Sequence, residues 1–190
     1  FFNPMFNFLN NSILNKWGIN VGDDVVVDLE NYIGQDVGCP VTKNYPPHKE
    51  IVNSLDYTFY IRPHSISLIP VASQSSAIKI APLVLTASRE KSWAETDKTL
   101  QVHFDSDKDS KGPIVMAAVI WEAKNDTKQA DTKLIIFTDA EFLTNNFIKE
   151  YSNATIALNA VSWLSELENI ITIPKKNLKP EPLNLTSQQK

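Results

Sequence analysis

Glycine and cysteine are scarce in this chain. Five of its 190 residues are glycine and one, Cys39, is cysteine. So little glycine leaves almost no room for the loops that cradle phosphate groups, and the sequence contains no GxGxxG, P-loop, GxSxG or HExxH motif. No cofactor is therefore expected. The single cysteine excludes an internal disulfide and a zinc site made of cysteines, and its Gly/Pro loop disfavours a catalytic thiol.

Long apolar runs and clusters of positive charge are also missing. No stretch approaches the roughly 20 apolar residues that cross a bilayer, and the sequence shows no signal peptide. The formal net charge is −4 and the basic residues are scattered, which argues against nucleic-acid binding. Apolar residues make up 43% of the chain, enough for one domain with a substantial core.

The run Leu-Ile-Ile-Phe at residues 134–137 is the most informative stretch that is present. It is continuously apolar and leads directly into Thr138-Asp139-Ala140-Glu141. Such a run is typical of a strand covered on both faces, as in the parallel sheets of α/β proteins. The run therefore favours a parallel sheet.

The remaining pattern predicts strands at 25–27, 57–62, 65–69, 78–80, 81–86, 114–121 and 170–173, and helices at 4–17 and 154–168. Residues 29–50 form a long Gly/Pro-containing loop, a feature that is often functional. We predict an α/β fold with a mainly parallel sheet flanked by helices and an inserted antiparallel strand section. One domain is expected over residues 1–173, with a flexible tail over 174–190.

Caps and side-chain spacing support both helices. Gly18 suits the C-terminal cap of the first helix, and Asn153 suits the N-terminal cap of the second. The buried face of the second helix is expected to consist of Ile156, Ala160, Trp163, Leu164 and Leu167.

The polar residues after the 134–137 run are the first place to look for a site. In parallel α/β sheets, ligands bind beyond the carboxyl ends of the strands, where Asp139 and Glu141 are expected. The two carboxylates suit general acid/base catalysis or metal binding. We favour the alternative that they cap a helix beginning near Glu141 and complement its dipole. The candidate ligand-binding residues are Tyr45, His48, Asp139, Glu141, Asn145 and Asn146.

Three further patterns have a functional and a structural interpretation. Trp93 and Trp121 suit sugar stacking in a carbohydrate-binding module, although core packing is the default for tryptophan. A divergent hydrolase would bring His48 within hydrogen-bonding reach of Asp139. The alternating aspartates at 105, 107 and 109 resemble the start of a calcium loop, but the required glycine and glutamate are missing, so a solvated loop is expected.

Several segments together resemble one family, the auxiliary, non-ATPase subunits of bacterial ABC-2-type transporters, of which the gliding-motility G protein is a member. The segments that carry the resemblance are WGI at 17–19 with DVVVD at 24–28, NYPPHKEI at 44–51, PLVLT at 82–86 with Ser92-Trp93, Gly112-Pro113, TDAEFLTN at 138–145 and LNAVSWL at 158–164. The family often has Gly-Asp-Ser-Asp where this chain has Thr138-Asp139-Ala140-Glu141, so the first polar position of a crevice site departs from the pattern.

The resemblance implies a Rossmann- or flavodoxin-like fold similar to class I glutamine amidotransferases, without their cysteine. The same domain type occurs in intraflagellar-transport proteins, where it serves assembly. The resemblance also implies the C-terminal part of a larger domain on the extracytoplasmic side of the bacterial inner membrane, attached through membrane helices outside this chain. Its expected partners are the permease and ATPase subunits, with an exported glycan or polypeptide as a further ligand. The expected role is binding rather than catalysis.

Overall fold

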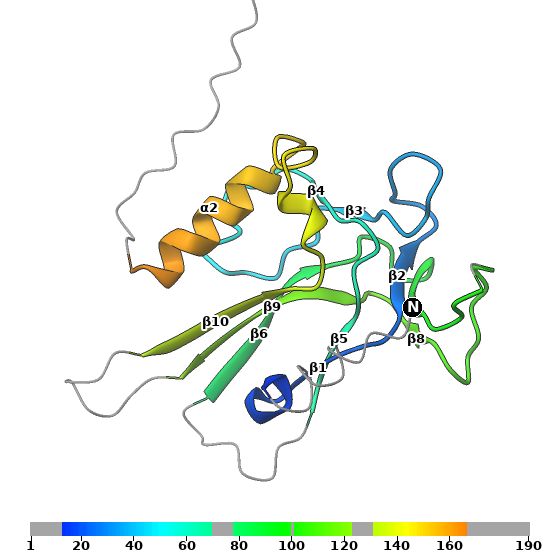
Figure 1. Cartoon of the computed structure of the whole chain (residues 1–190), viewed down its shortest axis with the longest axis horizontal. Coiled ribbons are helices and arrows are strands. Elements are labelled where there is room, and N and C mark those ends of the chain that lie inside the picture. The colour runs from blue at the N-terminus through cyan, green and yellow to red at the C-terminus, as the bar shows by residue number, and fades with distance from the viewer. Residues whose placement is uncertain (1–12, 70–77, 100, 123–130, 167–190) are drawn as a thin grey trace, which may run out of the picture.

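The computed structural model describes residues 13–69, 78–99, 101–122 and 131–166 (Figure 1). In chain order the elements are η1 (Leu14–Trp17), β1 (Ile19–Val21), β2 (Val25–Asp28), β3 (Val41–Thr42), β4 (Thr58–Phe59), β5 (Ile66–Leu68), β6 (Ile78–Leu85), β7 (Ser92–Glu95), β8 (Ser110–Lys111), β9 (Val115–Glu122), β10 (Thr132–Phe137), η2 (Glu141–Leu143) and α2 (Asn153–Leu164). Strands dominate this part of the chain, and α2 is the one α-helix in it.

Every strand pairing in the described residues is antiparallel. The strands form sheets with the orders β10-β9-β6, β2-β7-β8, β1-β5 and β3-β4. The predicted α/β fold with a mainly parallel sheet flanked by helices is therefore wrong, and the fold is β-rich. The prediction failed because an apolar run shows that a strand packs on two sides but does not show the direction of its neighbours.

The 134–137 run belongs to β10, at the edge of the longest sheet. β10 pairs with β9 from Thr132 opposite Glu122 to Phe137 opposite Ala117. All six of its residues are half-buried. The expectation of two covered faces still has a physical basis, because the side chains of β10 alternate between two hydrophobic cores.

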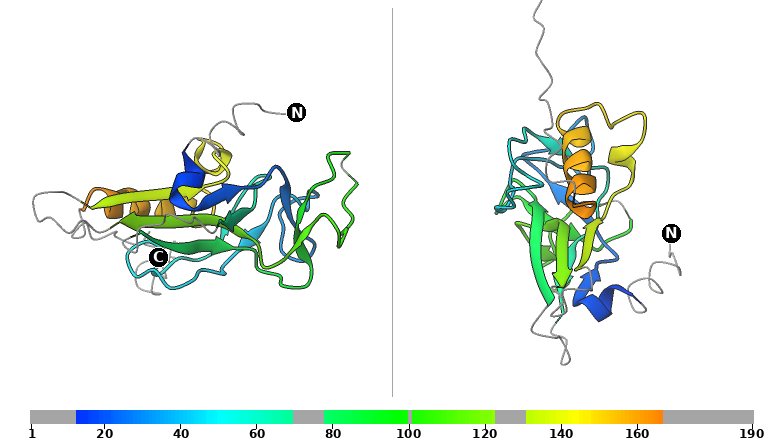
Figure 2. Two further views of the ribbon diagram at one scale, coloured as in Figure 1. Left: turned by 90° about the horizontal axis from the view of Figure 1, so that it is seen from below. Right: turned by 90° about the vertical axis from the view of Figure 1, so that its left-hand side faces the viewer.

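The two cores lie on opposite faces of the β10-β9-β6 sheet. The α2-side core contains Ile156, Ala160 and Trp163 of the helix, and Ile135 and Phe137 of β10 pack against it. The η1-side core contains Ile19, Val21, Ile66, Ala118 and Ile120, with Leu134, Ile136, Leu14 and Trp17 packed against it. Figures 1 and 2 show α2 and η1 on opposite sides of the sheet.

Most of the apolar strands are confirmed, with shifted bounds. Residues 25–27 lie in β2, residues 114–121 lie mostly in β9, and the segments 78–80 and 81–86 form the single strand β6. The short strands β1, β3, β7 and β8 were not predicted. The predicted strand at 170–173 and tail at 174–190 lie outside the described residues, as does most of the first predicted helix.

Two buried asparagines fix α2 to the segment that crosses it. Asn153 was predicted to cap the helix, but Ser152 occupies the cap position. Asn153 Oδ1 instead accepts a hydrogen bond from Phe59 N at 3.2 Å, and Asn159 Nδ2 donates to Ile51 O at 2.9 Å. The helix is thus held by polar bonds at both of these positions as well as by its apolar face.

Gly18 takes the predicted role at the end of the first helical segment. η1 ends there with Gly18 in the left-handed conformation, at φ 76°, and the Gly18 N–H returns to Asn15 O. Glycine adopts this conformation without the steric penalty of a side chain.

Candidate functional site

The carboxylate of Asp139 organises the turn that follows β10. Its Oδ1 accepts a hydrogen bond from Glu141 N at 2.6 Å, and its Oδ2 accepts one from Ile61 N at 2.8 Å. The residue is buried, and burial raises the pKa of the Asp139 carboxyl above its ordinary value, while backbone N–H groups act in the opposite direction. Both oxygens are used to hold the η2 turn against the 61 segment, with Ala140 rather than Asp139 at the N-terminal cap position of η2.

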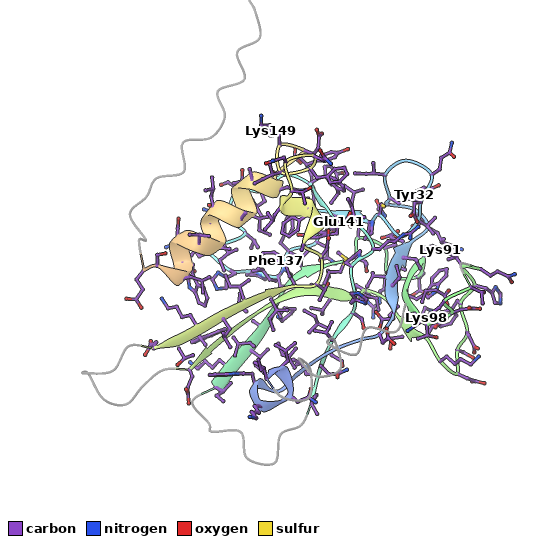
Figure 3. The ribbon with its side chains drawn as sticks, viewed as in Figure 1. Tyr32, Lys91, Lys98, Phe137, Glu141 and Lys149 are labelled. Carbon is purple, nitrogen blue, oxygen red and sulfur yellow. The ribbon has the colours of Figure 1, made fainter. Side chains whose placement is uncertain are left out.

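Glu141, Asn145 and Asn146 lie around the same turn and are exposed. Glu141 begins η2 and is labelled beside Phe137 in Figure 3. Its backbone carbonyl accepts bonds from Thr144 N and Oγ1. The turn thus presents one carboxylate and two amides to solvent, but Asp139 itself faces inward.

His48 packs elsewhere, on the helix. Its ring lies edge-on to Trp163 with 5.4 Å between ring centroids. Its Nδ1 is 3.4 Å from Glu50 Oε2 but makes no well-aligned hydrogen bond. Burial lowers the pKa of His48, against the opposing influence of Glu50. In the described chain no hydrogen bond or ion pair joins His48 to Asp139, so the structure does not assemble the pair that a hydrolase at this crevice requires.

Tyr45 acts as a clamp within the long loop. Its hydroxyl lies 2.9 Å from Thr42 O, 2.7 Å from Asp56 O and 2.9 Å from Thr58 Oγ1. Burial raises the pKa of Tyr45 to about 12. Cys39, in the same loop, also has its thiol pKa raised, first by burial and then by Asp36, which disfavours the reactive thiolate.

The two tryptophans proposed for sugar stacking are both packed against protein. Trp93 is 5% exposed, lies edge-on to Phe104, and donates its indole N–H to Glu95 Oε2 at 3.0 Å. Trp121 is half-buried against the α2-side core. Their packing matches the default role of tryptophan.

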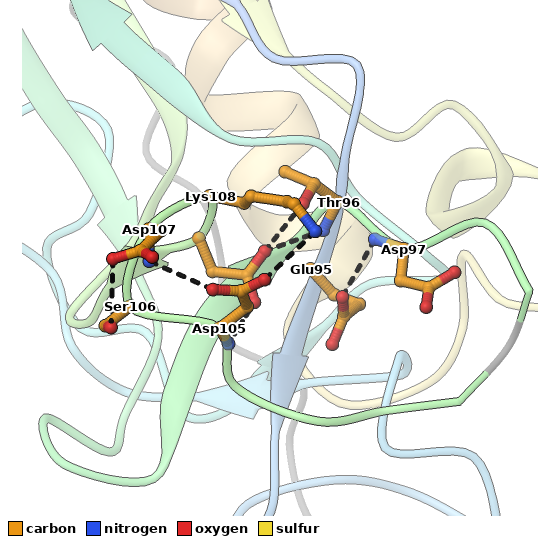
Figure 4. A network of polar contacts seen from close by, with 8 residues as sticks. Glu95, Thr96, Asp97, Asp105, Ser106, Asp107 and Lys108 are labelled. Carbon is orange, nitrogen blue, oxygen red and sulfur yellow. Dashed lines mark hydrogen bonds and ion pairs between the residues drawn. The ribbon is translucent and has the colours of Figure 1, made fainter.

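The alternating aspartates form a closed loop of polar contacts (Figure 4). Asp109 accepts hydrogen bonds from Thr96 N, Thr96 Oγ1 and Asp105 N, and Asp105 pairs with Lys108 at 3.1 Å. Backbone and hydroxyl donors thus occupy the oxygens that calcium would need. Across the described ranges, no three His, Cys, Asp or Glu side chains are placed to hold a metal ion.

A cleft that the sequence did not indicate lies between β2, the 35–38 loop, the 95–98 segment and Val102. Its volume is about 630 Å³, and valines line its apolar part. Its charged groups are largely paired: Arg62 bonds Asp36 through Nε and Nη2, and Lys98 pairs with Asp23. Arg62 has a left-handed backbone at φ 47°, a strained conformation for a residue with a side chain. No sequence signal joins these segments, since they lie far apart in the chain.

The outer face of α2 is a second feature that the sequence reasoning missed. Leu158 is 60% exposed, Val161 is 59% exposed and Leu164 is 42% exposed. Leu164 was predicted to lie on the buried face of the helix, and this prediction is wrong. The signal was present at positions 158, 161 and 164, whose helical spacing places them on a face separate from Ile156, Ala160 and Trp163. We refer to Leu158, Val161 and Leu164 as the outer α2 face.

Neither a protein-family model nor a curated protein sequence matches the chain. Among solved structures, the chain is similar to the N-terminal domain of mmIFT52, with a TM-score of 0.53 and 14% sequence identity. The match covers 82% of this chain, which spans 56% of that one. At this identity the likeness shows a shared fold and bears on no transporter assignment. In the described residues, no helix is long and apolar enough to cross a membrane.

Proposed function

We propose that this chain is a non-catalytic binding domain of an ABC-type transport complex and that the outer α2 face is its contact with a partner subunit. The observation that carries the proposal is the exposure of Leu158, Val161 and Leu164 on a helix whose opposite face is already buried. Large apolar side chains that lie together on an exposed helix face are typical of a protein contact, whereas scattered ones are not.

Two more large apolar side chains are exposed in the segment that leads into the helix. Leu143 of η2 is 38% exposed and Tyr151, just before α2, is 56% exposed. Contiguous exposed apolar side chains rimmed by polar residues mark interaction sites, whereas scattered ones do not.

The choice of partner rests on the sequence resemblance. The motifs at 44–51, 138–145 and 158–164 resemble the auxiliary subunits of ABC-2-type transporters, whose partners are a permease and an ATPase. The last of these motifs contains the outer α2 face itself. The Asp139 and His48 geometry supports a role without turnover, because the carboxylate oxygens are used by backbone amides and the imidazole packs on Trp163.

Affinity capture of the full-length protein from detergent-solubilised membranes tests the proposal. The test variant is Leu158→Glu with Val161→Glu, and the matched control is Ser67→Glu, an exposed polar position in β5 on the other side of the sheet. Because both apolar side chains are already exposed, the free energy of unfolding should change by only about 0.5 kcal/mol.

The wild type and Ser67→Glu are expected to co-purify with an ATPase and a multi-span permease. The double variant should recover at least about tenfold less of both subunits, which corresponds to a loss of about 1.4 kcal/mol of binding free energy. Equal recovery of both subunits with all three proteins would refute the assigned surface. Failure of the wild type to recover either subunit would refute the transporter assignment.

A further inference from the structure

Within the described residues, one edge of the β10-β9-β6 sheet has backbone groups without a strand partner. The strand order β10-β9-β6 leaves β10 with a neighbour on one side only among the described residues. Backbone N–H and C=O groups along such an edge are a template for another extended strand. The question is which groups of β10 point outward.

The register answers it. Thr138 N donates to Met116 O at 3.2 Å, so residues 138 and 116 form a hydrogen-bonded pair of the antiparallel ladder. These pairs alternate along the strands. With Phe137 opposite Ala117, the even residues of β10 bond to β9. The N–H and C=O groups of Lys133, Ile135 and Phe137 therefore point away from β9.

The side chains of β10 are apolar on both faces. Ile135 and Phe137 pack against the α2-side core, while Leu134 and Ile136 pack against the η1-side core, and all of them remain half-buried. Lys133 is the one charged residue in the strand. Its ammonium group is turned onto α2, where it donates to Trp163 O at 3.3 Å and lies 3.4 Å from Glu166 Oε1. No charge in β10 opposes an incoming strand.

The opposite edge of the sheet is different. In β6, Pro82 pairs with Ala118, whose backbone groups face β10, so the nitrogen of Pro82 faces outward and lacks a proton. The register of β6 also shifts between Pro82, Val84 and Leu85. Proline and bulges are the devices that protect strand edges from further pairing. β6 is protected in this way, and β10 is not.

We propose that the outer edge of β10 is a strand-addition site, which takes an extended, uncharged segment of a partner polypeptide with apolar side chains on both faces. Main-chain bonds to Lys133, Ile135 and Phe137 provide the affinity. The two cores determine which segment binds, because apolar side chains on each face of the added strand would pack against the core on that side of the sheet. This surface is separate from the outer α2 face, and its existence does not depend on the proposed function.

Amide hydrogen exchange resolved by residue tests the site directly. In the chain alone, the outward amides of Ile135 and Phe137 should exchange at least about tenfold faster than the inward amides of Leu134 and Ile136. The probe is the capped octapeptide KTVIVITK, whose six uncharged central residues stand for the added strand and whose terminal lysines keep it soluble. Its addition should slow exchange at Ile135 and Phe137 by at least about tenfold, with little change at Ile78 and Ile80 on the protected edge.

Two controls separate strand addition from other binding. The same peptide with its four central residues N-methylated cannot form the ladder and should give no protection. The variant Ile135→Pro removes an outward N–H in the same way that Pro82 does in β6, and it should also abolish protection. If that variant does not fold, the N-methylated peptide provides the same test on the wild-type chain.

Three outcomes overturn the proposal. Equal protection of Ile135 and Leu134 in the dilute chain would show that the edge is already covered. Equal protection by the N-methylated peptide would show that the peptide binds without forming a ladder. Protection that grows with protein concentration, together with dimer formation and without any peptide, would identify a second copy of the chain as the occupant.

Discussion

Asp28 offers the sharpest test of how buried carboxylates hold this fold together. It is fully buried at the end of β2. Oδ1 accepts hydrogen bonds from Glu30 N at 3.0 Å, Asn31 N at 2.9 Å and Ser88 Oγ at 2.6 Å, and Oδ2 accepts one from Ser88 N at 2.9 Å. The carboxylate thus joins the start of the long loop to the segment between β6 and β7.

The substitution Asp28→Asn keeps the shape and replaces one acceptor oxygen with a donor. If the amide oxygen keeps the three bonds of Oδ1, the new NH₂ group faces the N–H of Ser88. A bond to a charged group contributes about 1.5–3 kcal/mol, and an unsatisfied buried donor costs about 1–3 kcal/mol. Because these terms overlap, we expect the free energy of unfolding to fall by about 3 kcal/mol.

Urea denaturation measures this change as a lower midpoint at constant slope. The control is Asp36→Asn, which removes a carboxylate that is 44% exposed and paired with Arg62. Exposed ion pairs contribute at most about 1 kcal/mol, so this variant should lose less than that. A loss below about 1 kcal/mol for Asp28→Asn as well would refute the reasoning that Asp28 organises these loops.

Four further predictions follow from single contacts. Burial lowers the pKa of His48, so the folded state favours the neutral imidazole and the protein loses stability as the pH falls below about 6.5. Between about pH 7 and pH 5, the urea midpoint should therefore fall more for the wild type than for His48→Phe. Burial raises the pKa of Asp139, so this carboxyl has the opposite effect and the protein loses stability as the pH rises above about 4. Between about pH 4 and pH 7, the urea midpoint of Asp139→Asn should therefore rise relative to that of the wild type. Asn159→Ala removes the bond to Ile51 O and should cost about 1–2 kcal/mol by urea denaturation, and an unchanged midpoint would show that the bond does not anchor α2. Gly112→Ala would place a methyl group 2.0 Å from Ser92 Oγ and 2.8 Å from Ser92 O, so we expect a loss of about 1–3 kcal/mol in the same measurement.

Sequence patterns located the apolar strands but not their partners. The apolar runs in β2, β6, β9 and β10 can be recognised in the sequence, because their side chains are apolar where they pack in the two cores. The direction of pairing depends on connections that no local pattern encodes, and the parallel sheet was wrongly predicted for that reason. The short strand β7 was missed because its ends, Ser92 and Glu95, are polar and give no apolar signal. In the structure both are buried, and they bond to Ser88, Trp93 and His103.

Among the candidate site residues, too, the sequence predicted local contacts but not contacts between distant segments. The bond from Glu141 N to Asp139 was accessible from sequence, since an aspartate commonly accepts a bond from the backbone N–H two residues later. Its second bond, to Ile61 N, joins residues 78 positions apart and was not accessible. The cleft around Arg62 and Asp36 likewise depends on three distant segments. The outer α2 face was present in the sequence as helical spacing and was missed by attention to the buried face alone.

Site-specific photocrosslinking in intact cells tests the central claim most directly. A photoreactive amino acid replaces Val161, which is 59% exposed on the outer α2 face, or Leu68, which is 64% exposed on β5, on the other side of the sheet. We predict that the full-length protein crosslinks to a permease or ATPase subunit from position 161 and not from position 68. Crosslinking of such a subunit from position 68 alone, or from neither position, would contradict it.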